Sequence, residues 1–133
     1  MEKNREDEPG LILIGVVGVC ASGKSTLIRG LQSRGYRARH IAQEHSYVKD
    51  MWKKITNPDM LIFLDVSFPM TVTRRQLTWR EVDWAEQQRR LAHAREHADF
   101  YLQTDKLSAN EVLEEVICFV QTFLAKGQFH TTP

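Results

Sequence analysis

Cysteine is scarce in this chain of 133 residues, where only Cys20 and Cys118 occur. Two cysteines cannot form the disulfide framework that holds many small secreted proteins together, and such usage is typical of a reducing compartment. Long hydrophobic runs are also missing, because no apolar segment approaches the ~20 residues that a membrane-spanning helix needs. We therefore expect a cytoplasmic protein that does not enter a membrane.

The chain also has no large excess of positive or negative charge. Lysine and arginine total 18 against 17 aspartates and glutamates, which leaves a net charge of +1. This balance argues against binding of nucleic acids through bulk positive charge, although it does not exclude a local basic site. Hydrophobic residues make up 42% and charged residues 26%, as in an ordinary globular domain. The length suits one domain, which we place at residues 10–127, between flexible tails at residues 1–9 and 128–133.

Four segments have the pattern of β-strands. Residues 11–17 and 60–66 are almost continuously apolar, which is typical of strands buried on both faces of a parallel sheet. The four predicted strands are residues 11–17, 36–42, 60–66 and 100–104. Because helical patterns separate them, we expect an α/β fold, namely a three-layer αβα sandwich around a small parallel sheet of about four strands.

Helical periodicity fills the segments between the predicted strands. A first helix is expected at residues 24–33, followed by Gly35 in the position of a helix-ending glycine. A second, amphipathic helix is expected from Tyr47 to Ile55. Residues 70–97 are rich in arginine, glutamate, glutamine and alanine, which predicts one bent helix or two short ones. The last helix begins at the capping box of residues 108–111.

One motif indicates a specific chemistry. Residues 18–25, Gly-Val-Cys-Ala-Ser-Gly-Lys-Ser, fit the pattern G-x-x-x-x-G-K-[ST] between a predicted strand and a predicted helix. The glycines let the backbone curl until successive N–H groups point inward and bind phosphate oxygens, and the helix N-terminus adds the positive end of its dipole. The residues that we expect to contact a nucleotide are Gly18, Ala21, Ser22, Gly23, Lys24, Ser25 and Thr26.

Three side chains of this motif have separate predicted roles. Lys24 would reach the β- and γ-phosphates, Ser25 would bind Mg²⁺ through its hydroxyl, and Thr26 would contact the phosphate chain. ATP and Mg²⁺ are therefore the expected ligands, and Cys20 is interpreted as a spacer. The alternative is a glycine-rich turn with an exposed lysine, which the strand–loop–helix context disfavours.

Two carboxylates are candidates for metal binding and proton transfer. Asp65 closes the predicted strand at residues 60–66, and ligands of open parallel sheets bind beyond the carboxyl ends of the strands. Asp65 would bind Mg²⁺ together with Ser25, or else cap the next turn as a structural residue. Glu44 follows the second predicted strand at the same edge, where it would accept a proton from a substrate hydroxyl or hold metal-bound water. The alternative for Glu44 is a polar loop before the following helix.

Arginines gather in the segment after Asp65. A phosphoryl group in transfer needs cations beside its oxygens, and Arg74 and Arg75, followed by Arg80, are the candidates. Because acidic residues are interspersed, a solvated helix with charges of both signs is the alternative. His93 and His97 are expected to be surface histidines, since no third metal ligand stands out beside them.

Taken together, these segments resemble the P-loop nucleoside and nucleotide kinases. Residues 18–26 are similar to the phosphate loop of that group, and residues 57–67 are similar to the strand that precedes its lid. Residues 70–97 resemble the lid, and residues 98–105 resemble the final strand. Glu44 matches the place where nucleoside kinases carry the carboxylate that contacts the acceptor. The resemblance implies a P-loop NTPase fold and transfer of the γ-phosphoryl group of ATP to a small-molecule acceptor.

The chain departs from this group in one region. A single predicted helix joins Glu44 to Pro58, which leaves no room for the additional strand that usually carries an acidic or Asp-Arg motif. The alternative function is therefore a nucleotide-binding or slowly NTP-hydrolysing regulatory module without a phosphate acceptor. A sheet of about four strands leaves an edge exposed, which makes a homodimer a candidate assembly.

Overall fold

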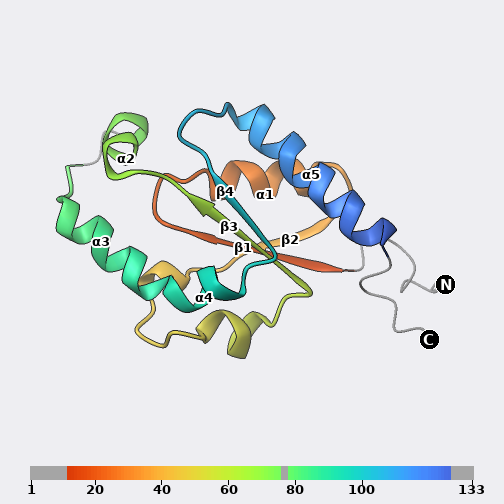
Figure 1. The fold of residues 1–133 in the computed structure, drawn as a ribbon, viewed down its shortest axis with the longest axis horizontal. Coiled ribbons are helices and arrows are strands. Elements are labelled where there is room, and N and C mark those ends of the chain that lie inside the picture. Colours follow the sequence, from red (N-terminus) through yellow and green to blue (C-terminus); the bar gives the residue numbers. More distant parts are fainter. Residues whose placement is uncertain (1–11, 76–77, 127–133) are drawn as a thin grey trace.

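A computed structural model describes residues 12–75 and 78–126 of the chain (Figure 1). Both predicted tails, residues 1–9 and 128–133, lie outside the described residues. The described part is an α/β fold whose four strands form one parallel sheet, as the sequence predicts. Within the described ranges, no helix has both the length and the apolar composition that crossing a membrane would require.

All four strands run in the same direction, in the spatial order β2-β1-β3-β4. The two central strands are the two apolar runs of the sequence, and every residue of the strand Met60–Asp65 is buried. Of the two edge strands, β4 alternates between partly buried and exposed residues, and β2 has a single buried residue, Ala38. The strands are β1 (Leu13–Gly18), β2 (Arg37–His40), β3 (Met60–Asp65) and β4 (Phe100–Gln103).

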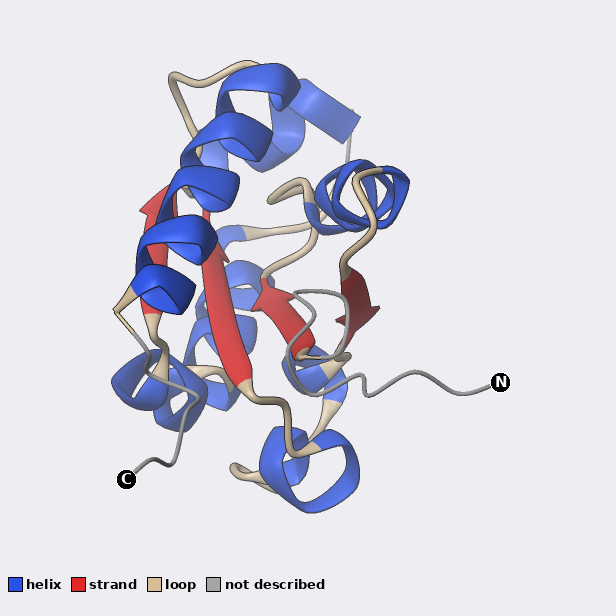
Figure 2. Cartoon of the chain, turned by 90° about the vertical axis from the view of Figure 1, so that its right-hand side faces the viewer, coloured by secondary structure: helices blue, strands red, loops and turns tan. Residues whose placement is uncertain are grey.

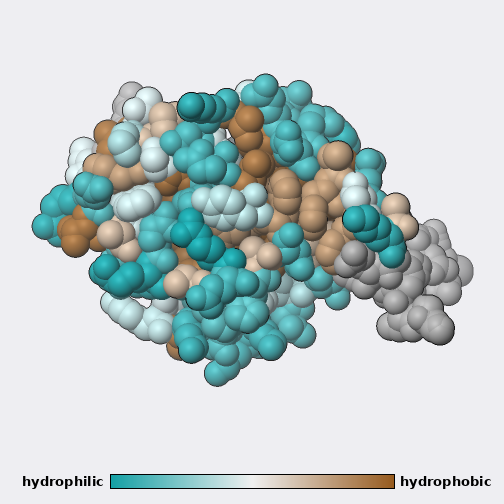
Figure 3. All heavy atoms as spheres, viewed as in Figure 1, coloured by the Kyte–Doolittle hydropathy of each residue, from teal (hydrophilic) through white to brown (hydrophobic). Residues whose placement is uncertain are grey.

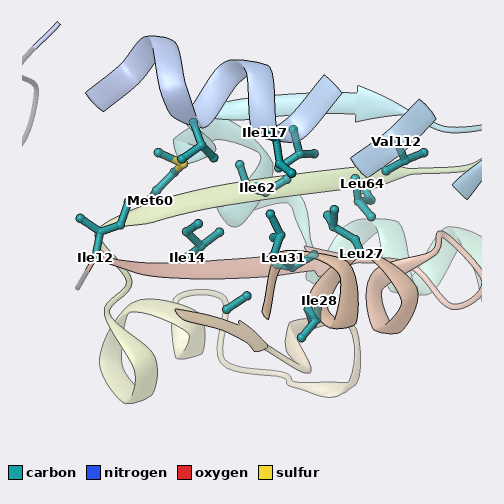
Figure 4. Close-up of a cluster of buried hydrophobic side chains, with 14 residues drawn as sticks. Ile12, Ile14, Leu27, Ile28, Leu31, Met60, Ile62, Leu64, Val112 and Ile117 are labelled. Atoms are coloured by element: carbon teal, nitrogen blue, oxygen red, sulfur yellow. The ribbon is translucent and has the colours of Figure 1, made fainter. Parts of the chain in front are cut away.

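Two long helices cover one face of the sheet. They are α1 (Lys24–Ser33) and α5 (Ala109–Ala125), and both agree with the predicted helices. Figure 4 shows their apolar side chains, among them Leu27, Leu31 and Ile117, pointing toward residues of β1 and β3. The capping box that opens α5 is confirmed, because the Ser108 hydroxyl accepts a hydrogen bond from the amide of Glu111.

The opposite face is covered by shorter elements, so helices lie on both sides of the strands (Figure 2). This arrangement is compatible with a three-layer sandwich. Val17, Leu61 and Phe63 of the sheet pack there against Trp52 and Leu91. The helices of this part of the chain are α2 (Phe68–Arg75), α3 (Glu81–Arg90) and α4 (Ala92–His97).

The segment 70–97 was predicted as one bent helix or two short ones. The helical character is confirmed, but the predicted number of helices is wrong. Three helices occur, because the chain is not helical at residues 78–80 and breaks again at Leu91. The first break suits the start of α3, where the side chain of Asp83 accepts a hydrogen bond from the amide of Arg80. Leu91 is fully buried at the second break, so the sharp turn places its side chain in the core.

The amphipathic helix predicted from Tyr47 to Ile55 is confirmed only in its second half, where the chain forms a short π-helical turn, η4 (Trp52–Thr56). A 3₁₀ turn, η3 (Gln43–His45), lies before this region, and residues 47–50 are not helical. Tyr47 and Ile55 are 86% and 75% exposed, so the expected apolar face is not buried. The cause is Gln43, a fully buried side chain that donates to the carbonyl of Val48 at 2.8 Å and accepts from the amide of Trp52 at 2.8 Å. These two bonds take backbone groups that a continuous helix would use, and the chain wraps around the amide instead.

Figure 3 shows that the face seen in Figure 1 is mostly hydrophilic, with a band of hydrophobic atoms near β4 and α5. Partly buried aromatic and aliphatic residues of these two elements, including Phe100, Leu102 and Phe119, pack against the core there. Because β4 is an edge strand of the sheet, this side of the molecule carries both an open strand edge and apolar surface.

Candidate functional site

Residues 18–24, called here the glycine-rich loop, connect the carboxyl end of β1 to the first residue of α1. Two of its glycines are required by the geometry. A Cβ added at Gly18 would lie 2.2 Å from the carbonyl oxygen of Leu64, and Gly23 has a φ of +103°, in the region that favours glycine. The loop therefore passes too close to β3, and turns too sharply, for larger residues at these two positions.

Lys24 folds back over this loop. Its Nζ donates hydrogen bonds to the carbonyl oxygens of Gly18 at 2.7 Å and Val19 at 3.0 Å. The same ammonium forms an ion pair with Glu44, 3.2 Å from Oε2. Lys24 is only 7% exposed, so its charge is held inside the loop and directed toward one carboxylate.

Glu44 reaches this position because β2 and β1 are parallel neighbours. Val16 of β1 pairs with His40 of β2, and the chain then turns through η3 beside the glycine-rich loop. Glu44 is 2% exposed, and within the described residues its Oε1 has no hydrogen-bond partner. A buried carboxylate with an unsatisfied oxygen is costly, so this atom is available to a proton, a hydroxyl or a metal.

A cavity of about 460 Å³ opens above the loop. This volume falls within the ~300–1,000 Å³ typical of small-molecule pockets. The cavity walls include residues 20–27, the ends of β2 and α2, and the segment between β4 and α5. The side chains outside the loop that matter most for its chemistry are His40, Glu44, Arg74, Arg75 and Thr104.

Arg74 and Arg75 both line this cavity but differ in their contacts. Arg74 donates to the carbonyl oxygens of Ala21, at 3.1 Å, and Thr104, and to the Thr104 hydroxyl at 2.9 Å. Arg74 therefore ties the glycine-rich loop to the end of β4. Arg75 is exposed and makes no hydrogen bond or ion pair within the described ranges, so its charge is free to meet an anion. Arg80 lies outside the cavity lining and pairs with Asp83 at 3.6 Å.

Asp65 does not join Ser25. Its Oδ1 accepts from the amide of Val66 at 2.9 Å and from Gln88 at 2.8 Å, and its Oδ2 accepts from Arg95 and from the Tyr101 hydroxyl. Asp65 thus lines a second cavity of about 420 Å³, whereas Ser25 lines the first. These contacts direct the carboxylate of Asp65 away from the cavity that Ser25 lines, and the bond to the amide of Val66 fits the structural alternative; a shared metal ion at Asp65 and Ser25 stays a prediction.

Two groups near these carboxylates have shifted pKa values. Burial, followed by the hydrogen bond and charge of Asp65, raises the pKa of the Tyr101 hydroxyl. Burial, followed by the positive charge of Lys24, lowers the pKa of His40, whose Nε2 lies 3.8 Å from Glu44 Oε2. The His40 ring is therefore mainly neutral at pH 7.

Sequence reasoning missed two side chains that shape the loop. Thr104 is buried, and its hydroxyl donates toward the carbonyl oxygens of Ser22 at 3.1 Å and Asp65 at 3.2 Å. Gln87 of α3 accepts from the amide of Cys20 at 3.0 Å and donates to its Sγ at 3.3 Å. The position of Thr104 at the end of a predicted strand could have indicated that it lies at the sheet edge beside the loop. Nothing in the sequence links Gln87 to Cys20.

His97 is exposed, as the sequence predicts, whereas His93 is partly buried. Their rings stack with centroids 4.2 Å apart, and Trp52 donates from Nε1 to Nδ1 of His93 at 3.1 Å. The pair thus helps to fix Trp52 at the edge of the core. Both cysteines are free thiols.

No family model and no curated protein matches this sequence.

Proposed function

We propose that this chain is an ATP-binding protein of the P-loop NTPase type and a small-molecule kinase that uses Mg²⁺. The observation that carries the proposal is the arrangement of the glycine-rich loop. It lies between a buried parallel strand and a helix, and the Lys24 ammonium closes it against the carbonyls of Gly18 and Val19 at the cavity.

The start of α1 favours phosphate binding. The first amides of a helix have no intrahelical partner, and they carry the positive end of the helix dipole. The N-cap residue Gly23 makes no side-chain cap bond, and no acidic residue occupies the first turn of α1. These amides, together with the exposed hydroxyls of Ser25 and Thr26, are therefore open to an anion in the cavity.

Mg²⁺ fits the hydroxyl of Ser25, which lines the same cavity as Glu44. Bound there, the ion would neutralise charge on the β- and γ-phosphates. Because Asp65 is turned into the other cavity, the carboxylate role passes to Glu44 in this proposal. Glu44 then holds a metal-bound water or takes the proton of the acceptor hydroxyl.

In the transfer step, the acceptor oxygen forms a bond to the γ-phosphorus while the bond from that phosphorus to the β,γ-bridging oxygen breaks. The proton of the acceptor hydroxyl passes to Glu44, and ADP leaves with the bridging oxygen. Lys24 and Arg75 offset the negative charge on the transferred group. Arg74 holds the glycine-rich loop in shape through Ala21 and is therefore a positioning residue.

A specific observation favours the alternative, a nucleotide-binding or slowly hydrolysing regulatory module. Between β2 and β3 the chain forms η3 and η4 only, wrapped around Gln43. This part of the described chain holds no further strand on which an acceptor pocket would be built. The two functions differ in the fate of the γ-phosphoryl group, which goes to a small molecule in the first and to water, slowly, in the second.

Calorimetric titration with ATP in the presence of Mg²⁺ tests the proposal. Lys24→Ala removes a charge-assisted contact with the phosphates, worth about 1.5–3 kcal/mol, so we expect affinity to fall about 10- to 150-fold. The matched control is Lys53→Ala, which removes an exposed lysine of η4 and should leave binding unchanged. Absence of ATP binding by the unaltered protein, or equal binding by Lys24→Ala, refutes the nucleotide site.

Transfer from γ-labelled ATP to a panel of nucleosides, nucleotides and small acids then separates the two functions. A labelled acceptor supports the kinase. Release of inorganic phosphate alone, with ATP binding intact, refutes the kinase and supports the regulatory module.

A further inference from the structure

A thiol, a carboxylate and an imidazole meet beside the glycine-rich loop. One ligand atom from each of Cys20, Glu44 and His45 lies within 4.8 Å of the other two. Cys20 belongs to the loop, whereas Glu44 and His45 belong to the 3₁₀ turn η3. Three different donor types are thus brought together by two segments of the chain that are far apart in sequence.

The carboxylate at the centre of this cluster is not fully used by the protein. Oε2 of Glu44 is paired with Lys24, but Oε1 has no hydrogen-bond partner in the part of the chain that the structure describes. Glu44 is 2% exposed, so bulk water does not readily serve this oxygen. An additional hydrogen-bond donor or a cation beside Oε1 would stabilise this buried carboxylate.

Two imidazoles lie near this carboxylate, one from the end of β2 and one from η3 itself. Nε2 of His45 is 3.7 Å and Nε2 of His40 is 3.8 Å from Glu44 Oε2. His40 therefore lies beside Glu44 but outside the group of three residues whose ligand atoms are all within 4.8 Å of one another.

The sulfur of Cys20 is already oriented by a neighbour. Gln87, which is buried, donates to Sγ at 3.3 Å, and its carbonyl oxygen accepts from the amide of Cys20 at 3.0 Å. Partners of this kind, which fix a ligand without touching the metal, are a regular feature of protein metal sites.

We propose that Cys20, Glu44 and His45 form a binding site for a divalent transition metal of the Zn²⁺ type, with three protein ligands and a fourth position for water. Thiolate and imidazole are ligands that Zn²⁺ favours, whereas Mg²⁺ takes oxygen ligands almost exclusively. This site therefore differs in ligand chemistry from a Mg²⁺ site at Ser25, although both would use Glu44, and Zn²⁺ binding does not require a nucleotide.

The ligand atoms need to move only slightly to bind a zinc ion. Bonds of about 2.0–2.3 Å from zinc to nitrogen, oxygen and sulfur place tetrahedral ligands roughly 3.5 Å apart. The distance of 3.7 Å between His45 Nε2 and Glu44 Oε2 is close to this value. His45 is exposed, so its ring is free to approach Cys20 without repacking the core. On binding, a zinc–sulfur bond forms and the thiol proton passes to solvent.

Lys24 is the group that opposes this metal, because its ammonium shares Oε2 of Glu44. A metal ion on Glu44 therefore competes with the ion pair between Lys24 and Glu44. Cys20, His40 and Glu44 also line the first cavity, so occupation by zinc would alter the surface that the cavity offers to a ligand.

Titration of the full-length protein with Zn²⁺, without nucleotide, tests the site by calorimetry. We expect one ion per chain, and we expect Cys20→Ser and His45→Gln each to weaken binding by more than the roughly 10- to 100-fold that loss of an outer partner costs. Loading with Co²⁺ gives a second signal, a thiolate-to-cobalt charge-transfer band that Cys20→Ser abolishes. Circular dichroism of each variant shows whether it is folded.

The chain offers matched controls for both ligand types. Cys118→Ser removes the other, exposed thiol, and His97→Gln removes the stacked pair with His93 as a competing zinc site. Both variants should bind Zn²⁺ as the unaltered protein does. The proposal is overturned if Zn²⁺ does not bind, if folded Cys20→Ser binds it unchanged, or if His97→Gln abolishes binding. None of these outcomes bears on ATP binding, which the Lys24→Ala experiment tests separately.

Discussion

Lys24 Nζ lies 3.2 Å from Glu44 Oε2, and the two side chains are only 7% and 3% exposed. A buried pair of opposite charges is sensitive to loss of either member, because the remaining charge stays in a poorly solvated place. The pair also joins the two segments of the candidate site, the glycine-rich loop and η3. The ion pair between Lys24 and Glu44 is therefore expected to affect both the stability of the fold and the binding of a ligand.

Replacing Glu44 should be far more costly than breaking an ion pair on the surface. We expect Glu44→Ala to lower the free energy of unfolding by about 3–5 kcal/mol. The control is Glu114→Ala, which breaks the exposed pair with Arg34 at 2.8 Å and should cost about 0.2–1 kcal/mol. Urea denaturation measures both variants, and equal costs would show that the buried pair contributes nothing special.

Thr104 should act as a brace for the glycine-rich loop. Thr104→Val keeps the shape of the side chain but removes the hydroxyl that contacts Ser22, Asp65 and Arg74. We expect a loss of about 1–3 kcal/mol in the free energy of unfolding, since the buried partners are left unsatisfied, together with weaker ATP binding. Thr122→Val, at an exposed position of α5, is the control. Unchanged stability and binding in Thr104→Val would contradict the bracing role.

Gly18 and Gly30 make a contrasting pair. A Cβ at Gly18 would meet the backbone oxygen of Leu64 at 2.2 Å, whereas a Cβ at Gly30 would meet Cδ2 of Leu113 at 2.9 Å. A side-chain tip can move aside and β3 cannot, and Gly30 also lies inside α1, where alanine gains about 0.5–1 kcal/mol. We therefore expect Gly18→Ala to lower the melting temperature strongly and Gly30→Ala to change it little. The reverse order in thermal unfolding would refute the close approach of the loop to β3.

His40 gives stability a dependence on pH. Its pKa is lowered in the folded state by burial and by Lys24, so the unfolded chain binds more protons as the pH falls below the ordinary histidine value of 6.5. The contribution of His40 is thus fully present above that value and is lost as the pH falls through the folded-state pKa. Urea denaturation between pH 5 and about pH 8 should show a smaller decline in His40→Gln than in the unaltered protein. An identical decline in the two proteins would contradict the shift.

Hydrophobic periodicity and helix-capping residues within each segment were sufficient to predict most of the fold. The strands β1 and β3 are continuous apolar runs, and α1 and α5 have a regular apolar stripe with recognisable ends, so all four follow from periodicity and capping. The segment from Tyr47 to Ile55 has helical spacing as well, yet only residues 51–55 of it are helical. Gln43 binds its backbone from outside the segment, and no periodicity within the segment records that interaction.

In the candidate site, too, some features follow from local sequence and others from contacts between distant segments. The sequence by itself determined the glycine-rich loop, because the motif, the apolar strand before it and the amphipathic helix after it are all encoded within residues 11–33. Only the tertiary structure decided which carboxylate faces Lys24. Asp65 and Glu44 both follow strands, but Gln88, Arg95 and Tyr101, which lie 23 to 36 residues further along the chain, hold Asp65 in the second cavity. Hydrogen bonds and charge between distant segments set the direction of a side chain at a strand end, and such contacts exist only once the chain has folded.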